Sequence, residues 1–400
     1  MTDQQIFIDG AWDRLSDRDR IEVENPATED LIGTIPACTA EDADRAVTAA
    51  LAAQPSWAAL PPIQRAAALH KLAALIKANT DHLARVLVSE QGKPFQQAIG
   101  EVGAAATFLT YAAEHARRIT GDIIASDNPN EEIHVRRHPR GVVVGLTAWN
   151  YPLALAARKL GPALIAGNTF VLLSHEITPV SGLELARLAE QAGFPPGVFN
   201  VLTGQGRVVG EALVAHPKAD MITMTGSSRA GVEIFRNAAV GLKPLSLELG
   251  GKAPFIVMED ANIDEAVAAA VTARYTNCGQ ICTCAERFYL HRAIADEFTE
   301  KFVARSKTLS IGEPMENPDM GPKVSRIEVN KVDAMVADAI DEGAEPVFQG
   351  ELSGPLFEKG HWLAPSVLSV KDNASAIMQD EVFGPVAPLL SVDGFDQAIS

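Results

Sequence analysis

Three of the four cysteines in this 400-residue chain lie within seven positions, in the segment NCGQICTCAER. Clustered thiolates bind metal ions, form redox disulfides or act as nucleophiles. Cys278, Cys282 and Cys284 lack the paired C-x2-C spacing typical of zinc sites, and they contain no C-x-x-C redox motif. The spacing therefore favours one nucleophilic thiolate, with backbone N–H groups at the Gly279–Gln280 turn exposed for a developing negative charge. The alternative for any one of these cysteines is a small buried apolar residue.

A carboxylate in the segment LELGGK is a candidate general base. Glu248 stands between two leucines, at the end of a predicted strand and before two glycines. Glycines let the backbone approach a ligand closely. We expect Glu248 to be buried, and burial raises the pKa of a carboxyl group toward the range that suits a general base. The alternative is a buried structural salt bridge.

Two glycine-containing segments have the composition of phosphate-binding turns. In MTMTGSSRAG, Thr225, Gly226 and Ser227 follow a predicted strand and open a helix, where N–H groups and hydroxyls can contact a pyrophosphate. The segment TGQGRVVG, which contains Gly206, misses the G-x-G-x-x-G spacing by one position. Helix capping by the serine and an ordinary strand-to-helix turn are the alternatives.

The hydrophobic pattern predicts the elements that position these residues. After a short β-like opening, amphipathic helices are expected at residues 40–54, 62–91 and 95–118. From residue 142, apolar strands alternate with helices expected at 153–166, 179–192 and 206–215. This alternation predicts a parallel, doubly wound α/β sheet, which binds nucleotides beyond the carboxyl ends of its strands. The same alternation of strands and helices begins again near residue 249, with helices expected at 293–308 and 324–342. We therefore expect a second α/β unit there.

Composition and charge exclude several classes of protein. The formal net charge is −17 and no dense Lys/Arg tract interrupts it, which argues against nucleic-acid binding. No apolar run has the roughly 18 residues that a membrane helix needs. The segment MTDQQIFIDG lacks the pattern of a signal or transit peptide, so we expect a cytoplasmic protein with reduced thiols.

Five segments in this order, AWNYP, TGSSRAG, LELGGK, YTNCGQIC and EVFGPV, resemble the NAD(P)-dependent aldehyde dehydrogenase superfamily. The segment CTCAERFYL is most similar to the lactaldehyde and glycolaldehyde dehydrogenase branch, with succinate-semialdehyde-type enzymes as relatives. The resemblance implies a variant Rossmann domain for NAD over residues 1–119 and 141–248. It also implies a bridging or oligomerisation segment over 120–140 and a catalytic domain over 249–400.

The resemblance also implies roles for individual residues. Cys282 becomes the nucleophile that attacks the aldehyde carbon, Asn150 a donor to the resulting oxyanion, and Glu248 the base that activates water to hydrolyse the thioester. The implied cofactor contacts are Trp149, Glu176, Gly206, Gly226, Ser227, Leu249, Glu381 and Phe383, with Gly206 near the adenine. Thr283 and Tyr151 are expected to line the substrate pocket. The expected reaction is oxidation of a small hydroxyaldehyde to an acid.

The sequence departs from the family pattern at three places. Leu173 replaces a lysine expected to hold the adenosine ribose, so we expect weak cofactor binding, and Glu176 favours NAD over NADP unless a protonated His175 offsets its charge. Ala148 replaces a proline ahead of Asn150, which removes a restraint on φ. The chain also ends where family members continue, so we expect a missing C-terminal part and a homodimer or homotetramer only when that part is present.

Two other classes stay open at this stage. One is an acylating or phosphate-linked reductase with the same fold, although Glu248 and Asn150 argue against it. The other is a non-catalytic or weakly active scaffold, which Leu173 and the expected missing end favour.

Overall fold

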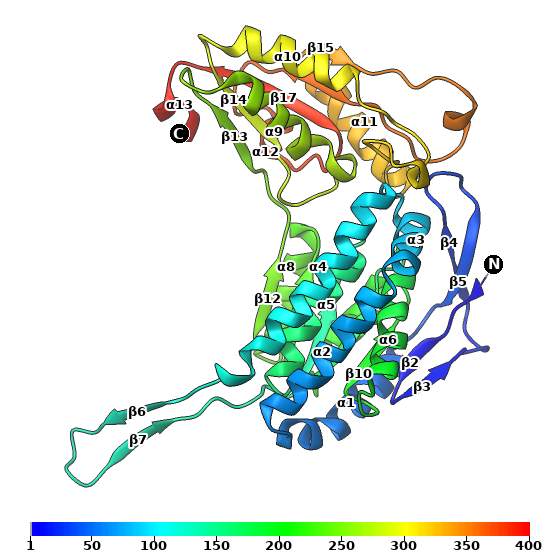
Figure 1. The fold of residues 1–400 in the computed structure, drawn as a ribbon, viewed down its shortest axis with the longest axis vertical. Coiled ribbons are helices and arrows are strands. Elements are labelled where there is room, and N and C mark those ends of the chain that lie inside the picture. Colours follow the sequence, from blue (N-terminus) through cyan, green and yellow to red (C-terminus); the bar gives the residue numbers. More distant parts are fainter. Residues whose placement is uncertain (1) are drawn as a thin grey trace. The chain divides into compact units, whose positions relative to one another are not determined.

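The computed structural model describes residues 2–400, which divide into two compact units (Figure 1). The first unit contains the chain up to Val23, Leu31–Leu87 and Ile99–Glu248. The second contains Glu24–Asp30, Val88–Ala98 and Leu249–Ser400. Two short pieces from the first hundred residues thus belong to the unit that holds the C-terminal part of the chain.

A seven-stranded sheet of order β12-β11-β8-β9-β10-β2-β3 forms the centre of the first unit. Five of its strands run parallel, and β2 and β3 add to one edge as an antiparallel pair. The strands are β2 (Ile6–Ile8), β3 (Ala11–Asp13), β8 (Val142–Leu146), β9 (Thr169–Leu173), β10 (Phe199–Leu202), β11 (Met221–Thr225) and β12 (Leu245–Glu248). The predicted parallel, doubly wound sheet is confirmed.

Helices cover this sheet, and their bounds are α1 (Ala40–Ala59), α2 (Pro62–Ala78), α3 (Thr80–Gln91), α4 (Phe95–Ala113), α5 (Pro152–Ile165), α6 (Val180–Ala192), α7 (Glu211–Ala215) and α8 (Ser228–Ala239). The prediction of one helix over 62–91 is wrong, because the chain breaks at Asn79. Both the backbone N–H and the side-chain amide of Asn79 donate to the carbonyl of Leu75, at 3.1 and 2.8 Å, which ends α2. The helix predicted over 95–118 ends earlier, at Ala113, and continues as a 3-10 turn to Arg117.

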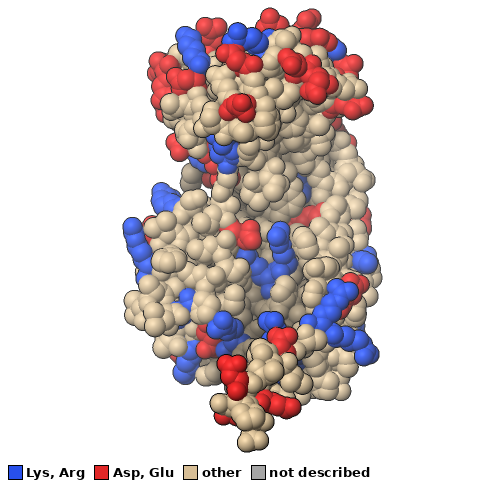
Figure 2. All heavy atoms as spheres, turned by 90° about the vertical axis from the view of Figure 1, so that its left-hand side faces the viewer, with Lys and Arg blue, Asp and Glu red and all other residues tan. Residues whose placement is uncertain are grey.

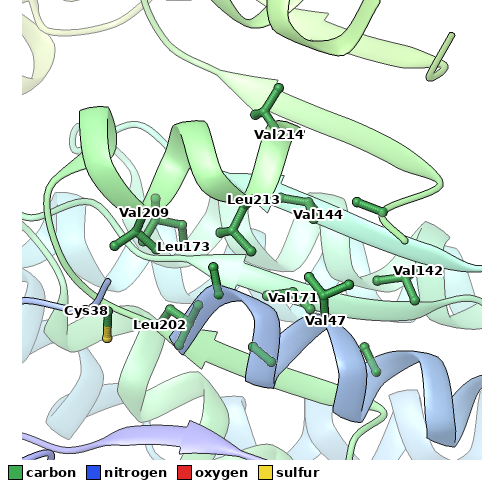
Figure 3. Close-up of a cluster of buried hydrophobic side chains, with 14 of the residues drawn as sticks. Cys38, Val47, Val142, Val144, Val171, Leu173, Leu202, Val209, Leu213 and Val214 are labelled. Carbon is green, nitrogen blue, oxygen red and sulfur yellow. The ribbon is translucent and has the colours of Figure 1, made fainter. Parts of the chain in front are cut away.

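Apolar side chains from the sheet and from α1 form the core of the first unit (Figure 3). The valines of β8 are buried, as a strand covered on both faces requires. Val47 of α1 lies beside Val171 in this cluster, Leu202 belongs to the same cluster, and Cys38 lies at its border. The core therefore holds the parallel strands in register below their carboxyl ends.

Two small sheets complete the first unit. The strands β1 (Thr2–Asp3), β5 (Leu31–Pro36) and β4 (Arg20–Glu24) form one of them. The antiparallel hairpin of β6 (Asp122–Ala125) and β7 (Glu132–Val135) forms the other and extends as a long arm in Figure 1. Every residue of its two strands is exposed.

The second unit is built on a five-stranded sheet of order β13-β14-β17-β16-β15, in which only β15 runs antiparallel to its neighbour. The strands are β13 (Pro254–Val257), β14 (Arg287–His291), β15 (Glu345–Gln349), β16 (Ser366–Ser369) and β17 (Val386–Val392). The helices are α9 (Ile263–Tyr275), α10 (Ala295–Lys307), α11 (Arg326–Asp341), α12 (Ala376–Gln379) and α13 (Phe395–Ile399). A second α/β unit is therefore present, as the repeated strand–helix pattern predicts.

On the face that Figure 2 shows, acidic side chains crowd the unit that contains β13–β17, in line with the net charge of −17. Over the described residues 2–400, no helix is both long enough and apolar enough to cross a membrane.

Candidate active site

The candidate residues of the first unit follow the carboxyl ends of its parallel strands. Trp149 and Asn150 follow β8, Glu176 follows β9 and Gly206 follows β10. Gly226 and Ser227 follow β11, and Glu248 is the last residue of β12. Because these five strands are mutually parallel, all of these residues lie along one edge of one sheet.

Asn150 lies at the start of α5 and is 5% exposed. The buried carboxylate of Glu101, on α4, accepts the backbone N–H groups of Leu153 and Ala154 at 3.0 and 3.2 Å. These N–H groups belong to the first turn of α5, where no intrahelical partner exists. Glu101 thus holds the segment that carries Asn150, in a place where Ala148 provides no φ restraint. Sequence analysis missed this residue, although a carboxylate among the alanines of an apolar helix was a usable signal.

Glu248 is exposed, so the prediction of its burial is wrong. The physical reason is its position as the last residue of β12, which is the edge strand of the sheet. Behind it lies a residue that sequence analysis missed, the buried Lys159 of α5, whose Nζ donates to Thr223 Oγ1 at 3.1 Å. Burial lowers the pKa of Lys159 to about 8, and the negative charge of Glu248 acts in the opposite direction.

The turn after β11 combines helix capping with an unpaired hydroxyl. Ser227 caps α8, since its Oγ accepts the N–H of Ala230 at 3.2 Å. Thr225 Oγ1 is buried and has no hydrogen-bond partner within the described residues 2–400. At Gly206, no atom lies within 4 Å of the position that a Cβ would take. An orphaned hydroxyl, an open glycine and a helix N-terminus at one sheet edge fit the binding of a nucleotide.

Glu176 and His175 follow β9, where the ribose contact is expected. Burial raises the pKa of Glu176, and the positive charge of Arg207 opposes this rise. Burial lowers the pKa of His175 to about 4, and its Nδ1 accepts the N–H of Ile177 at 3.2 Å. His175 is therefore neutral near pH 7, so the condition under which its ring would offset the charge of Glu176 is not met at that pH.

In the second unit, Cys282 differs from the other cysteines in its exposure. Cys282 is exposed, whereas Cys38, Cys278 and Cys284 are buried. Burial raises the pKa of Cys38 and of Cys278 to about 12, and it also raises the pKa of Cys284. The three buried thiols are thus held in the protonated, unreactive form, and Cys282 is the cysteine that solvent reaches.

A sharp turn presents Cys282. Asn277, Cys278 and Gly279 adopt consecutive positive φ values of 51°, 57° and 71°. The Gln280 N–H donates to the Asn277 carbonyl at 3.0 Å. The expectation that this N–H is exposed for an oxyanion is therefore wrong. The buried Gln280 side chain accepts the N–H of Val324 at 3.0 Å, and this hydrogen bond fixes the turn to the segment that contains Val324.

The glycine pair that follows Leu249 lies beside Glu381 and Cys282. The Gly251 N–H donates to Glu381 Oε1 at 3.2 Å, and a Cβ on Gly250 would lie 2.2 Å from Glu381 Oε2. A Cβ on Gly251 would lie 3.6 Å from the carbonyl oxygen of Cys282. Burial raises the pKa of Glu381. The absence of a side chain at Gly250 therefore lets the Glu381 carboxylate approach this segment, whereas at Gly251 a Cβ would make only an ordinary contact with the Cys282 carbonyl.

The predicted residues thus form two groups. Trp149, Asn150, Glu176, Gly206, Gly226, Ser227 and Glu248 belong to the first unit, whereas Cys282, Leu249, Glu381 and Phe383 belong to the second. The residues of the first unit lie along one edge of its sheet, and in the second unit Glu381 and the backbone of Cys282 lie beside Gly250 and Gly251.

Comparison with known proteins gives a match over almost the whole chain. The family profile described as "Aldehyde dehydrogenase family" matches residues 12–400. The chain is 45% identical over 397 residues to 3,6-anhydro-alpha-L-galactose dehydrogenase of Vibrio sp. (strain EJY3), covering 99% of this chain and 83% of that protein. The chain belongs to the aldehyde dehydrogenase family.

Other members of the aldehyde dehydrogenase family agree with this assignment. Lactaldehyde dehydrogenase of Escherichia coli (strain K12) is 41% identical over 397 residues, which cover 99% of this chain and 82% of that protein. A solved structure of 3,6-anhydro-L-galactose dehydrogenase in complex with NAP (NADP) superposes with a TM-score of 0.97 at 47% identity, over 99% of this chain and 83% of that one. The predicted fold and resemblance are confirmed, and this aldehyde dehydrogenase is an NAD(P)-dependent oxidoreductase that acts on aldehydes.

Proposed function

We propose that this aldehyde dehydrogenase oxidises a small 2-hydroxyaldehyde to the corresponding 2-hydroxy acid, with Cys282 as the nucleophile. The observation that carries the proposal is the exposure of Cys282 in a chain whose other three cysteines are buried. Lactaldehyde is a 2-hydroxyaldehyde, and the open form of 3,6-anhydrogalactose carries the same group beside its aldehyde. The shared chemistry of the substrates that name these two relatives supports this substrate class.

In the proposed first step the deprotonated Cys282 Sγ, a thiolate, forms a bond to the aldehyde carbon as the carbonyl π bond breaks. The carbonyl oxygen becomes an alkoxide, and the side-chain amide of Asn150 together with the Cys282 N–H donates to it. NAD(P)+, when bound, accepts the hydride that leaves this carbon. Collapse of the alkoxide restores the C=O bond and leaves a thioester on Cys282.

The proposed second step hydrolyses this thioester. Glu248 takes a proton from water, whose oxygen attacks the thioester carbon, and the Cys282 thiolate leaves. The exposed position of Glu248 gives it direct access to water. The product is a carboxylic acid, and the released proton passes from Glu248 to solvent.

For the cofactor, we propose a preference for NAD+ over NADP+. The support is Glu176, whose negative charge repels a 2′-phosphate. The nearby Arg207 acts in the opposite direction, since its positive charge lowers the pKa of Glu176. Glu176→Gln should therefore lower KM for NADP+ relative to NAD+, and Arg207→Ala should raise it. A lower KM for NADP+ than for NAD+ in the unchanged protein would contradict the preference.

The test of the substrate class compares lactaldehyde with propanal, which differs only by lacking the 2-hydroxyl group. We expect kcat/KM for lactaldehyde to exceed that for propanal by roughly tenfold or more, since a site that binds a hydroxyl loses that bond with the analogue. Glycolaldehyde and succinate semialdehyde complete the panel. A higher kcat/KM for succinate semialdehyde would favour the semialdehyde-type alternative, and no NAD(P)H with any of these aldehydes would favour the scaffold alternative.

We further propose that residues 120–140 mediate self-association. The hairpin of β6 and β7 exposes Ile123, Ile124, Ile133 and Val135, and Ile123 is 74% exposed. Exposed apolar side chains on a two-stranded arm are typical of a contact surface. Size-exclusion chromatography with light scattering, applied to Ile123→Ser, should show a shift toward monomer; an unchanged mass would contradict this role.

A further inference from the structure

A buried cluster of charges in the second unit lies beneath the segment that carries Glu381 and Phe383. Glu286, at the start of β14, is completely buried. Its carboxylate accepts the Nζ of Lys252 at 2.9 Å and the guanidinium of Arg274 at 3.0 Å. Burial by itself raises the pKa of Glu286, but the positive charges of Arg274 and Lys252 hold it below the ordinary value. Glu286 is therefore ionised inside the protein.

The same carboxylate reaches the backbone of the 381–384 segment. Glu286 accepts the N–H of Val382 at 3.0 Å and the N–H of Phe383 at 3.2 Å. The Nζ of the buried Lys323 donates to the carbonyl of Phe383, which belongs to the next peptide group. Arg274 donates to the next carbonyl, that of Gly384, at 2.6 Å. Charged side chains thus bind four backbone groups within residues 382–384.

Phe383 adopts a conformation that requires such support. Its φ is +57°, which is uncommon for a residue with a side chain and costs free energy. The side chains that bind the backbone here have opposite charge, negative at the N–H groups of Val382 and Phe383 and positive at the carbonyl of Phe383. Burial lowers the pKa of Lys323 to about 8, so the folded protein keeps this amine inside although burial opposes its charge. The protein thus holds Phe383 in a conformation that costs free energy and buries the Lys323 amine beside it. We infer that this conformation of residue 383 serves the function of the segment.

We propose that Glu286 and Lys323 are positioning residues for the reaction, which bind the backbone N–H and the carbonyl of Phe383 and so fix the Glu381–Phe383 segment in the pose that receives the nicotinamide half of the cofactor. This inference rests on the proposed function, in which Glu381 and Phe383 contact the cofactor. Neither Glu286 nor Lys323 touches the reacting atoms; they act through the backbone of residues 382–383. A role in fold stability alone is the alternative, and the test separates the two.

Arg274 of this cluster also contacts the turn that presents Cys282. The test must therefore measure the reactivity of Cys282 separately from cofactor binding. Arg274 donates to the carbonyl of Gly279 at 3.2 Å and to that of Ala285 at 2.7 Å, on either side of Cys282. Glu286 and Lys323 bind the backbone of residues 382 and 383 directly, and Glu286 also pairs with Arg274. Lys323→Met leaves the pair of Glu286 and Arg274 in place, so it is expected to change the cofactor segment while Arg274 continues to hold the turn.

Fluorescence titration measures the binding of NADH and NADPH to three variants, Glu286→Gln, Glu286→Asp and Lys323→Met. Iodoacetamide labelling without cofactor measures the reactivity of Cys282 in the same variants. Lys323→Met is the main variant, because it removes a buried charge, retains most of the side-chain volume and should keep a cooperative unfolding transition. Glu300→Gln, at an exposed position on α10, is the matched control. We expect Glu286→Gln and Lys323→Met to raise the Kd for the reduced cofactor by roughly tenfold, the size expected for losing one charge-assisted hydrogen bond.

In the same variants we expect the labelling rate of Cys282 to stay within about twofold of the rate in the unchanged protein. The Glu300→Gln control should bind the reduced cofactor normally. Glu286→Asp, which keeps the negative charge, should bind the cofactor more tightly than Glu286→Gln. Phe383→Ala tests the assignment beneath the inference. If Phe383→Ala weakens cofactor binding while Lys323→Met and Glu286→Gln fold and bind normally, the positioning role is overturned and the proposed function stands. If Phe383→Ala itself binds normally, the cofactor assignment of this segment falls, and the inference falls with it.

Discussion

At the scale of single residues, exposure and charge separate reactive groups from supporting ones. Cys282 is exposed among three buried cysteines, and Glu248 is exposed at the end of an edge strand. Glu286 and Lys323 are buried and charged, and they bind backbone. Cys282 and Glu248, which are proposed to meet the aldehyde and water, are therefore accessible, whereas Glu286 and Lys323, which hold the backbone of residues 382–383, are enclosed.

Replacing Glu248 with glutamine should separate the two proposed steps. The amide cannot take a proton from water, so the thioester on Cys282 should accumulate after one rapid turnover. Stopped-flow absorbance with lactaldehyde and NAD+ should show a burst of NADH close to one per site, followed by a steady rate lower by roughly 100-fold or more. Mass spectrometry of the intact protein should detect the acyl adduct. Steady turnover without a burst would exclude Glu248 as the base.

The half-buried His175 gives a pH dependence of stability with a defined sign. The pKa of His175 is about 4 in the folded protein, below its ordinary value of 6.5, so the unfolded chain binds a proton in this window that the folded chain does not. Stability should therefore fall as the pH decreases from 6.5 to 4, and this contribution should be constant above 6.5. In His175→Asn, which can still accept the N–H of Ile177, the loss should be smaller. Urea unfolding at pH 7 and pH 4.5 measures it; equal losses in the two proteins would contradict the assignment.

At the scale of elements, turns between regular segments determine what reaches the site. The AWNYP segment is fixed by Glu101 at the N-terminus of α5, and the Cys282 turn is fixed by Gln280 and Arg274. Glycine is required where two such segments meet. At Gly279 the φ is +71°, and a Cβ would lie 2.4 Å from the carbonyl oxygen of Gly384.

Gly279→Ala should therefore distort the Cys282 turn. Alanine at a positive φ and the overlap with a backbone oxygen should together cost about 2 kcal/mol or more, and kcat should fall with stability. Gly103→Ala on α4 is the matched control, since no atom lies within 4 Å of its added Cβ and alanine favours a helix by up to about 1 kcal/mol. Thermal unfolding and NADH formation measure both variants. Equal behaviour of the two would show that the turn tolerates a side chain at residue 279.

The elements differ in how well their structure can be predicted from the sequence alone. The alternation of apolar and amphipathic segments predicts the parallel strands and most helices, because buried parallel strands require continuous apolar runs such as VVV of β8. The break at Asn79 depends on one local hydrogen-bonding side chain inside a helical pattern. The exposure of Glu248 depends on strand order, since the flanking leucines do not reveal that β12 is an edge. Glu286 pairs with residues up to 97 positions away, which no local pattern encodes.

At the scale of the whole molecule, the two units are not continuous in sequence. Glu24–Asp30 and Val88–Ala98 belong to the second unit. His361 Nε2 pairs with Glu24 at 2.7 Å, and its backbone N–H donates to the Pro26 carbonyl at 2.8 Å. Gln97 accepts the N–H of Asn277, in the turn that leads to Cys282, at 2.9 Å.

A fragment of residues 249–400 expressed alone should therefore fold poorly. It lacks the partners of His361 and Asn277, and burying polar groups without partners typically costs about 1–3 kcal/mol each. Near-ultraviolet circular dichroism and urea unfolding should show loss of fixed tertiary structure and of a cooperative transition. A cooperative transition in the fragment at the midpoint of the intact chain would show that the two short pieces contribute little.

The central claim is that the exposed Cys282 carries out NAD(P)-dependent oxidation of a 2-hydroxyaldehyde. The most direct measurement is NADH absorbance after mixing the protein with lactaldehyde and NAD+, for the unchanged chain and for Cys282→Ser, with labelling of the remaining thiols as a check on folding. The account predicts NADH and lactate in equal amounts from the unchanged protein and no NADH above background from Cys282→Ser. Undiminished NADH formation by a folded Cys282→Ser variant would contradict it.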